Sequence, residues 1–164
     1  MGKLVGRMKI TAQEEYGLRC LLQLARANEA EGLTVKEIAS REGLSQAYVE
    51  KLLRLLGKAE LIHSVRGVNG GYLLSKKPQE IHLSSVVRAL GSVLNTDEIC
   101  DKFSGKRETC IHIDDCCIRA AWTTLTQSIE SFLDQTLLSD LIETAEHAVS
   151  KRLEKKQIQS PFSV

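Results

Sequence analysis

A glycine-rich stretch between two short apolar segments places the strongest constraint on how this chain of 164 residues can fold. The apolar segments span 61–66 and 72–75, and Asn69-Gly70 lies between them. This pair is typical of a tight hairpin turn, because a primed turn requires positive φ at both central residues. The stretch therefore predicts a β-hairpin, with Arg66 at the end of its first strand.

Two capping boxes predict helices before the hairpin. In Thr11-x-x-Glu14, and again in Thr34-x-x-Glu37, the hydroxyl and the carboxylate satisfy free backbone amides reciprocally. The first box opens a helix whose leucines recur at helical spacing, and the second opens a shorter helix.

A third helix is expected after a short turn. The second helix spans 35–42, Gly43 supplies the turn, and Ser45 caps the third helix. The apolar stripe of the third helix consists of Val49, Leu52, Leu53 and Leu56. Two helices, a short turn and a glycine-tipped hairpin form the layout of a winged helix-turn-helix, whose second helix enters the major groove of DNA. An ordinary helical hairpin with a solvated polar face is the alternative interpretation.

The distribution of charge is more informative than the net charge of +1. Residues 33–77 carry eight Lys and Arg against four Glu, which gives +4. Residues 95–117 carry six Asp and Glu against three Lys and Arg, which gives −3. A basic segment beside an acidic one favours a protein with one face that binds phosphates and another face with a different function. The alternative is an ordinary solvated surface.

The second half of the chain predicts a long helix with an unpaired apolar seam. Ser84 is expected to cap a short helix over 85–93, after which the periodicity stops until residue 118. A helix over 118–136 then carries an a/d seam of Ile118, Trp122, Leu125, Ile129 and Phe132. We expect this seam to be covered in a symmetric dimer, with burial against the same chain as the alternative. Ser139 is expected to cap a last amphipathic helix that runs to about Lys156.

The cysteines indicate metal or redox chemistry. Four of the five, Cys100, Cys110, Cys116 and Cys117, fall within 18 residues, and disulfides rarely persist in a reducing cytosol. Such thiolates suit an iron–sulfur cluster or zinc, although structural zinc sites more usually have paired Cys-x2-Cys steps. A metal-free thiol switch is the alternative. Cys20 lies among leucines and is expected to be a small buried hydrophobe.

Other function classes find no support in the sequence. No apolar run reaches membrane-spanning length, and the basic start lacks the apolar core of a signal peptide, so we expect a cytoplasmic protein without membrane contact. No nucleophile–base pair or phosphate-binding glycine loop supports an enzyme.

Five segments match one known family: Met8-Lys-Ile-Thr, Tyr16-Gly-Leu-Arg, Ile38-Ala-x-Arg-x-Gly-Leu-Ser, Tyr48-Val-Glu-Lys-Leu-Leu and Val65-Arg-Gly-x-x-Gly-Gly-Tyr-Leu-Leu. Through them the chain resembles the Rrf-two family of winged-helix regulators, of the IscR, NsrR and RirA type. The resemblance implies a homodimer that crosses two long helices, binds a double-stranded DNA operator and holds an iron–sulfur cluster near the dimer interface.

The resemblance also implies which residues contact DNA. Arg66 matches an arginine that enters the minor groove, where narrow A·T-rich segments concentrate negative potential. Glu50 matches a position that bears on which operator class is recognised. The full set of expected DNA contacts is Ser45, Ala47, Tyr48, Glu50, Lys51, Arg66 and Gly67.

Three cysteines match the cluster ligands of the family, namely Cys100, Cys110 and Cys116. The gap between the first two is nine residues, against five in IscR-like members, and Arg119 stands where those members have a histidine ligand. Glu15 matches the place where NsrR-type members supply an aspartate from the first helix of the partner. We therefore expect Glu15 as fourth ligand, with His112 and Cys117 as rivals, and leave open whether the cluster is 4Fe–4S or 2Fe–2S.

The sequence thus predicts a mainly α fold with a small β-hairpin wing. Its expected parts are a winged helix-turn-helix DNA-binding domain (8–94), a cysteine-bearing loop (95–117), a dimerisation helix with a C-terminal helix (118–156) and flexible ends (1–7 and 157–164). The expected function is a homodimeric repressor that senses iron, nitric oxide or redox state through its cluster. The alternatives are a metal-free thiol-switch regulator, a zinc-stabilised regulator, and a redox or iron–sulfur carrier that does not use DNA.

Overall fold

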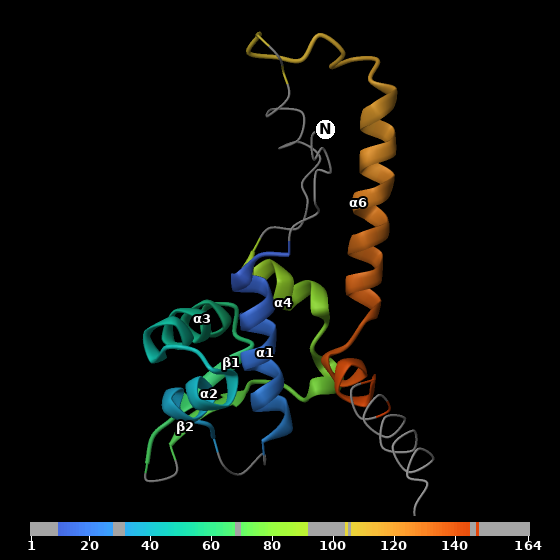
Figure 1. The fold of residues 1–164 in the computed structure, drawn as a ribbon. Coiled ribbons are helices and arrows are strands. Elements are labelled where there is room, and N and C mark those ends of the chain that lie inside the picture. Colours follow the sequence, from blue (N-terminus) through green and yellow to red (C-terminus); the bar gives the residue numbers. More distant parts are fainter. Residues whose placement is uncertain are drawn as a thin grey trace, which may run out of the picture.

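The computed structural model describes residues 10–27, 32–67, 70–91, 104, 106–144 and 147. Its elements are α1 (Ala12–Arg26), α2 (Val35–Glu42), α3 (Gln46–Lys58), β1 (Ile62–Val65), β2 (Gly71–Leu74), a 3₁₀ turn (Pro78–Glu80), α4 (Leu83–Leu90) and α6 (Cys117–Gln135). Figure 1 shows a compact group of helices with a hairpin and, beside it, one long helix. The predicted fold class, mainly α with a small wing, is confirmed.

The predicted caps form at the first three helices of the winged domain, by which we mean the described residues 10–91. Thr11 and Thr34 each complete a capping box. The hydroxyl of Ser45 accepts a hydrogen bond from the backbone N–H of Tyr48 at 3.3 Å. Gly43 ends α2 in the left-handed region, with φ of 66°, which glycine adopts without steric cost.

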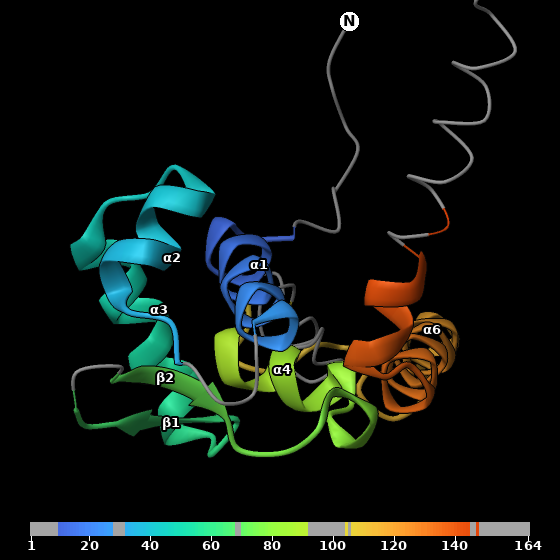
Figure 2. The same cartoon turned by 90° about the horizontal axis from the view of Figure 1, so that it is seen from below.

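One hydrophobic core holds the winged domain together. Figures 1 and 2 show α1 among α2, α3 and α4, and its apolar face packs against all three. The predicted stripe of α3 is buried in full, and the largest side chains enclosed with it are Leu21, Ile38, Ile81, Leu90 and Leu138. Tight packing of this kind makes each of these positions sensitive to loss of volume.

The hairpin forms, but its turn differs from the prediction. The strands pair antiparallel over four residue pairs, and Leu33 adds a bridge to Tyr72. The turn is closed by a hydrogen bond from the N–H of Gly70 to the carbonyl of Gly67 at 2.9 Å. Positive φ falls on Gly67, at 131°. Val65 pairs with Gly71, so residues 66–70 connect the strands and a two-residue turn centred on Asn69-Gly70 is wrong. Gly70 is needed instead because a Cβ there would meet a backbone oxygen at 2.6 Å; Asn69 itself lies outside the described residues.

Helix α6 matches the predicted 118–136 to within one residue at each end and contacts the winged domain through α4. After α6 the chain returns to the domain at a joint that we call the elbow, residues 81–83 and 134–138. Its centre is an antiparallel bridge between His82 and Leu137. The ring Nδ1 of His82 also donates to the carbonyl of Asp134 at 2.6 Å, which ties the C-terminal end of α6 to the start of α4.

Two predicted caps are wrong. Helix α4 starts two residues earlier than expected, with His82 at its N-cap, and Ser84 is 2% exposed inside the first turn. Ser139 likewise lies inside the helical stretch 138–144 and is 7% exposed. Both serines are turned into the protein because the bridge between His82 and Leu137 fixes where each helix begins.

Some predictions fall outside the described residues: the flexible ends (1–7 and 157–164), Cys100, and the last helix beyond residue 147. Among the helices that the structure does describe, none is long and apolar enough to cross a membrane.

Candidate functional site

The first two turns of α3 form one part of the candidate DNA interface. The side chains of Ser45, Ala47, Glu50 and Lys51 are exposed, while the opposite face of the helix lies in the core. The start of this helix is fixed by the Ser45 cap and by the glycine turn before it. An exposed N-terminal turn on a firmly packed helix is what entry into the major groove requires.

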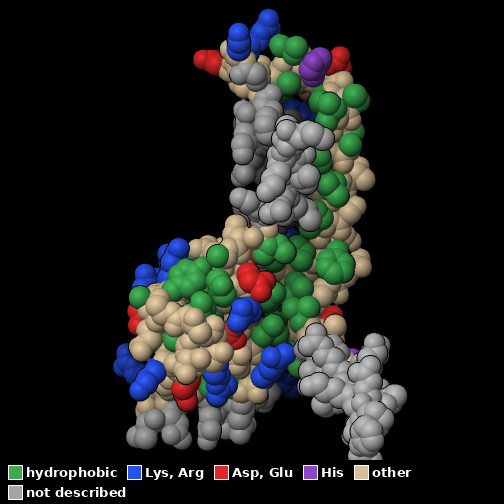
Figure 3. Space-filling view, in the orientation of Figure 1, with side chains coloured by type: hydrophobic (Ala, Val, Ile, Leu, Met, Phe, Trp, Pro, Cys, Tyr) green, Lys and Arg blue, Asp and Glu red, His purple; other side chains and the backbone are tan. Residues whose placement is uncertain are grey.

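The wing supplies the second part of the candidate interface. Arg66 and Gly67 follow β1 directly, and both are exposed. Figure 3 shows Lys and Arg side chains gathered along the edges of the winged domain. Positive charge of this kind attracts the phosphate backbone of nucleic acids.

Tyr48 differs from the other expected DNA contacts because it is half-buried. Its ring packs edge-on against that of Tyr16 in α1, with ring centroids 6.1 Å apart and an interplanar angle of 82°. The guanidinium of Arg19 lies over the Tyr16 ring, 5.3 Å from its centroid. Sequence reasoning missed this contact, because aromatic residues so far apart along the chain carry no local pattern.

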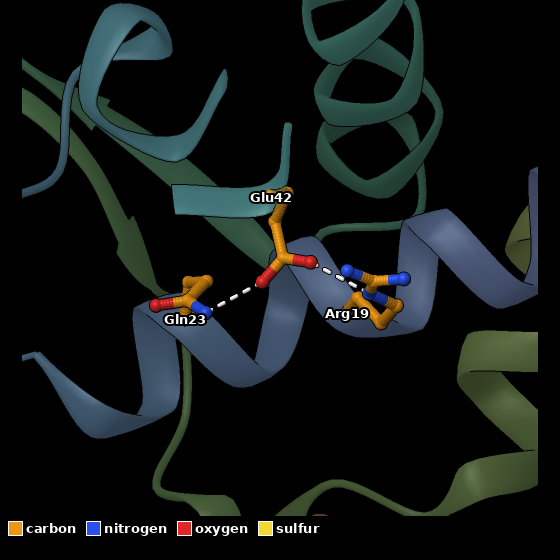
Figure 4. A network of polar contacts seen from close by, with 3 residues as sticks. All are labelled: Arg19, Gln23 and Glu42. Carbon is orange, nitrogen blue, oxygen red and sulfur yellow. Dashed lines mark hydrogen bonds and ion pairs between the residues drawn. The ribbon is translucent and has the colours of Figure 1, made fainter. Parts of the chain in front are cut away.

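Glu42, the last residue of α2, joins α2 to α1 (Figure 4). One carboxylate oxygen accepts from Nε of Arg19 at 2.6 Å, and the other accepts from Nε2 of Gln23 at 2.5 Å. The Glu42 side chain is only 6% exposed, so both hydrogen bonds are largely shielded from water. The hydrogen bond from Arg19 raises the pKa of that guanidinium further, so it stays charged. The sequence signal was present: Arg19 and Gln23 are four residues apart on one helix face.

The cysteine segment, by which we mean the described residues 106–117, leads into α6. Cys110 and Cys116 are half-buried, and Cys117 is exposed as the first residue of α6. Cys116 caps α6, and its Sγ accepts a hydrogen bond from the backbone N–H of Arg119 at 3.3 Å. A backbone donor on sulfur is an outer-shell contact that orients a metal-ligating thiolate.

The donor chemistry of this segment fits a cluster, although the described residues do not complete a site. Two half-buried thiols suit soft-metal chemistry. Across the described ranges, no group of three or more His, Cys, Asp or Glu side chains lies close enough together to hold a metal ion. His112 is exposed, and its ring Nδ1 lies 3.8 Å from Oδ1 of Asp115. A complete site therefore needs ligands from outside the described ranges, where Cys100 lies, or from a second chain.

Two residues of α1 bear on the ligand predictions. Glu15 is exposed in the first turn. Cys20 is fully buried, and burial raises the pKa of its thiol to about 11. The prediction that Cys20 is a small buried hydrophobe is confirmed.

The apolar seam of α6 is uncovered by the described part of the same chain. Trp122 is 44% exposed and Phe132 is 65% exposed, and α6 contains no buried residue. Hydrophobic side chains follow the length of this helix in Figure 3. A contiguous exposed apolar surface of this kind is typical of a protein–protein contact.

Comparisons with known sequences agree with this architecture. The model of the Rrf2 family, described as an iron-dependent transcriptional regulator, matches residues 10–144. The chain is 35% identical over 138 residues to the protein Rrf2 of Nitratidesulfovibrio vulgaris, which covers 84% of this chain and 89% of that protein. It is 31% identical over 140 residues to the transcriptional regulator NsrR of Bacillus licheniformis, with coverage of 85% and 96%.

Solved structures give the same result. The chain superposes on the IscR of T. potens with a TM-score of 0.69 and 31% identity, covering 86% of this chain and 90% of that one. CymR, the global cysteine regulator of B. subtilis, gives a TM-score of 0.68 and 28% identity, with coverage of 84% and 98%. Together with the helix-turn-helix, the wing and the long helix, these matches show that the chain belongs to the Rrf-two (Rrf2) family of winged-helix transcriptional regulators.

Proposed function

We propose that this DNA-binding regulator is a homodimeric repressor that senses iron, nitric oxide or redox state through an iron–sulfur cluster. The observation that carries the proposal is the exposure, on one packed domain, of both the start of α3 and the wing arginine Arg66. Two such elements on a rigid support are what simultaneous major- and minor-groove contact needs.

The exposed side chains suit distinct contacts with DNA. The carboxylate of Glu50 accepts from the exocyclic amine of cytosine and repels phosphates, which supports discrimination between operators. Lys51 suits a phosphate oxygen, and Arg66 suits a narrow minor groove. These contacts combine sequence recognition with general affinity.

The uncovered seam of α6 supports the dimer. Burying Trp122 and Phe132 against a second copy removes a large apolar surface from water. Operators for such regulators are commonly two-fold, with half-sites about one helical turn, or roughly 34 Å, apart. A dimer joined along α6 presents two winged domains for such a site.

The cysteine segment supports the cluster. Cys110 and Cys116 would hold it together with Cys100, and Glu15 of the partner subunit would complete the set. The bound cluster would supply an iron site with one weaker, exchangeable oxygen ligand, which suits a response to nitric oxide, oxygen or iron supply. Cys116 would serve this site with its sulfur already oriented by the Arg119 amide.

DNA binding by the wing is tested with Arg66→Ala. We expect weaker binding to every duplex tested and a plot of log affinity against log salt whose slope is smaller by about 1, because one phosphate-region contact is lost. The matched control Lys106→Ala removes one positive charge from the cysteine segment and is expected to bind as the parent does. An unchanged slope for Arg66→Ala would count against the proposed interface.

The cluster is tested by anaerobic purification, with an absorption spectrum and counts of iron and sulfide per chain. The proposal predicts a coloured protein with both elements present. A second candidate, a metal-free thiol switch, is favoured by the exposed thiol of Cys117 beside Cys116. Colourless protein that loses thiols stoichiometrically on oxidation would support that candidate instead.

A further inference from the structure

A continuous series of contacts runs behind α3, from the end of α2 to the proposed DNA-binding surface. A carboxylate oxygen of Glu42 accepts a hydrogen bond from Nε of Arg19 at 2.6 Å. The guanidinium of Arg19 lies over the ring of Tyr16, and this ring packs edge-on against that of Tyr48. We call these four residues the backing chain. Only Tyr48 belongs to the expected DNA contacts.

The backing chain limits where the Tyr48 ring can lie. Edge-to-face pairs have a preferred geometry, and a cation over the face of one ring adds an attraction to that ring's negative face. The Tyr48 ring is half-buried against Tyr16, whereas its neighbours Ala47 and Glu50 are exposed. Its orientation at the start of α3 is therefore set from α1.

The position of Arg19 is set in turn by Glu42. Arg19 is partly open to water, with 42% of its side chain exposed, so the ring contact alone leaves it several rotamers. The carboxylate of Glu42 is mostly shielded and receives donors on both oxygens, from Arg19 and from Gln23. Two donors on one carboxylate fix the guanidinium over Tyr16 and also fix α2 against α1.

We infer that Glu42 is a positioning residue for DNA recognition, acting through Arg19 and Tyr16 on Tyr48. The inference rests on the proposed function of the α3 surface. Glu42 touches no DNA itself in this account; it governs how sharply the surface discriminates between sequences. Non-specific attraction by Lys51 and Arg66 does not depend on it.

The variant Glu42→Gln tests this with little change of shape. A glutamine amide has one oxygen and no charge, so its hydrogen bond from Arg19 is weaker than that of the carboxylate, and the contact with Gln23 persists only if the Gln23 amide turns its own oxygen toward the new NH₂ group. Because this change also removes a negative charge, Glu60→Gln serves as the matched control. Glu60 is an exposed residue just beyond α3 and lies outside the backing chain.

The experiment uses the full chain, purified without oxygen. The wild-type protein first selects its tightest duplex from a random library, and the affinity ratio between that duplex and bulk genomic DNA is then measured for each variant. We expect Glu42→Gln to lower this ratio about tenfold, or ~1.4 kcal/mol, with bulk-DNA affinity nearly unchanged. Glu60→Gln is expected to keep the wild-type ratio.

A second pair of variants keeps the inference testable if Glu42→Gln folds poorly. Tyr16→Leu removes the ring that touches Tyr48 and is expected to lower the affinity ratio. Tyr16→Phe keeps the ring and is expected to keep the wild-type ratio. A ratio unchanged in both Glu42→Gln and Tyr16→Leu, or lost only in step with thermal stability, would overturn the inference while leaving the proposed function intact. A wild-type protein that selects no duplex would overturn the proposed function and this inference with it.

Discussion

The winged domain and α6 differ in where their apolar side chains lie. In α3 the stripe from Val49 to Leu56 is entirely buried by other parts of the same chain. In α6 the seam recurs just as regularly, yet none of its residues is buried. The winged domain thus buries its own apolar stripe, whereas the described part of the chain leaves the seam of α6 uncovered.

This difference in the burial of apolar side chains bears on how each region responds to a binding partner. A region that buries its own apolar surface keeps its geometry whatever its partners do. A region that depends on a second copy, as we propose for α6, changes its stability with protein concentration and with anything bound at the interface. The elbow joins the two regions, because Leu138 is fully buried in the winged domain while His82 holds the end of α6.

The largest expected contrast lies in thiol reactivity. With a pKa of about 11, only about one Cys20 in a thousand is a thiolate at about pH 8, and the side chain is also fully buried. We expect iodoacetamide to modify Cys20 at least about a hundredfold more slowly than the exposed Cys117 in cluster-free protein. Mass spectrometry of timed samples measures both rates, and guanidinium chloride should remove the difference. Rates within tenfold of each other in the folded protein would contradict a closed winged core.

The next effect is on the stability of the winged domain. Leu52→Ala empties part of the core and is expected to lower the free energy of unfolding by ~2–5 kcal/mol. Urea unfolding followed by circular dichroism measures this loss. A loss below about 1 kcal/mol would mean that the α3 stripe is not tightly packed.

The seam of α6 is tested by Trp122→Glu, which places a charge in the proposed dimer contact. We expect the free energy of dimer dissociation to fall by ~2–4 kcal/mol, which is typical for loss of a residue at the centre of an interface. Sedimentation equilibrium measures the change. The matched control Gln127→Glu adds the same charge to α6 on the side opposite the seam, because Gln127 is two residues from both Leu125 and Ile129. This control should leave the dimer intact; equal behaviour of the two variants would argue against the seam as the interface.

The smallest effect concerns the cap of α2. Hydrogen bonds from the backbone N–H and the hydroxyl of Thr34 lower the pKa of Glu37 below its usual value of 4.5. The charged form is therefore stabilised by folding. The wild-type protein should have a larger free energy of unfolding than Glu37→Gln. This difference should be complete above the pKa of Glu37 in the unfolded chain and should disappear as the pH falls through the pKa of Glu37 in the folded protein.

Urea unfolding of both proteins across this acid range measures the difference. A stability difference that does not vary with pH would show that the carboxylate charge of Glu37 plays no part in the cap.

Much of the winged domain was predictable because local chemistry and tertiary packing agree there. The boxes at Thr11 and Thr34 and the α3 stripe follow directly from spacing, and each is found. The serine caps at Ser84 and Ser139 failed because a contact between distant residues, His82 and Leu137, overrides the local preference.

The candidate site was predictable in part, for a similar reason. Lys51 is exposed as expected, because amphipathic spacing predicts which face of α3 contacts water. Arg66 is exposed at the end of the first strand of the hairpin, where the glycine-rich stretch predicted a turn. The backing chain of Glu42, Arg19, Tyr16 and Tyr48 was missed, since it depends on how three helices cross. The length of the wing turn was predicted wrongly, because the glycine pattern does not determine the pairing register of the two strands, in which Val65 lies opposite Gly71.

The central claim is that cluster chemistry in the cysteine segment controls DNA binding by the winged domains. It is tested most directly by measuring, without oxygen, the affinity of the selected duplex for cluster-loaded protein and for the same preparation after the cluster is removed by chelation. The account predicts affinities that differ by about tenfold or more, which is ~1.4 kcal/mol of coupling. Equal affinities in the two states would contradict it.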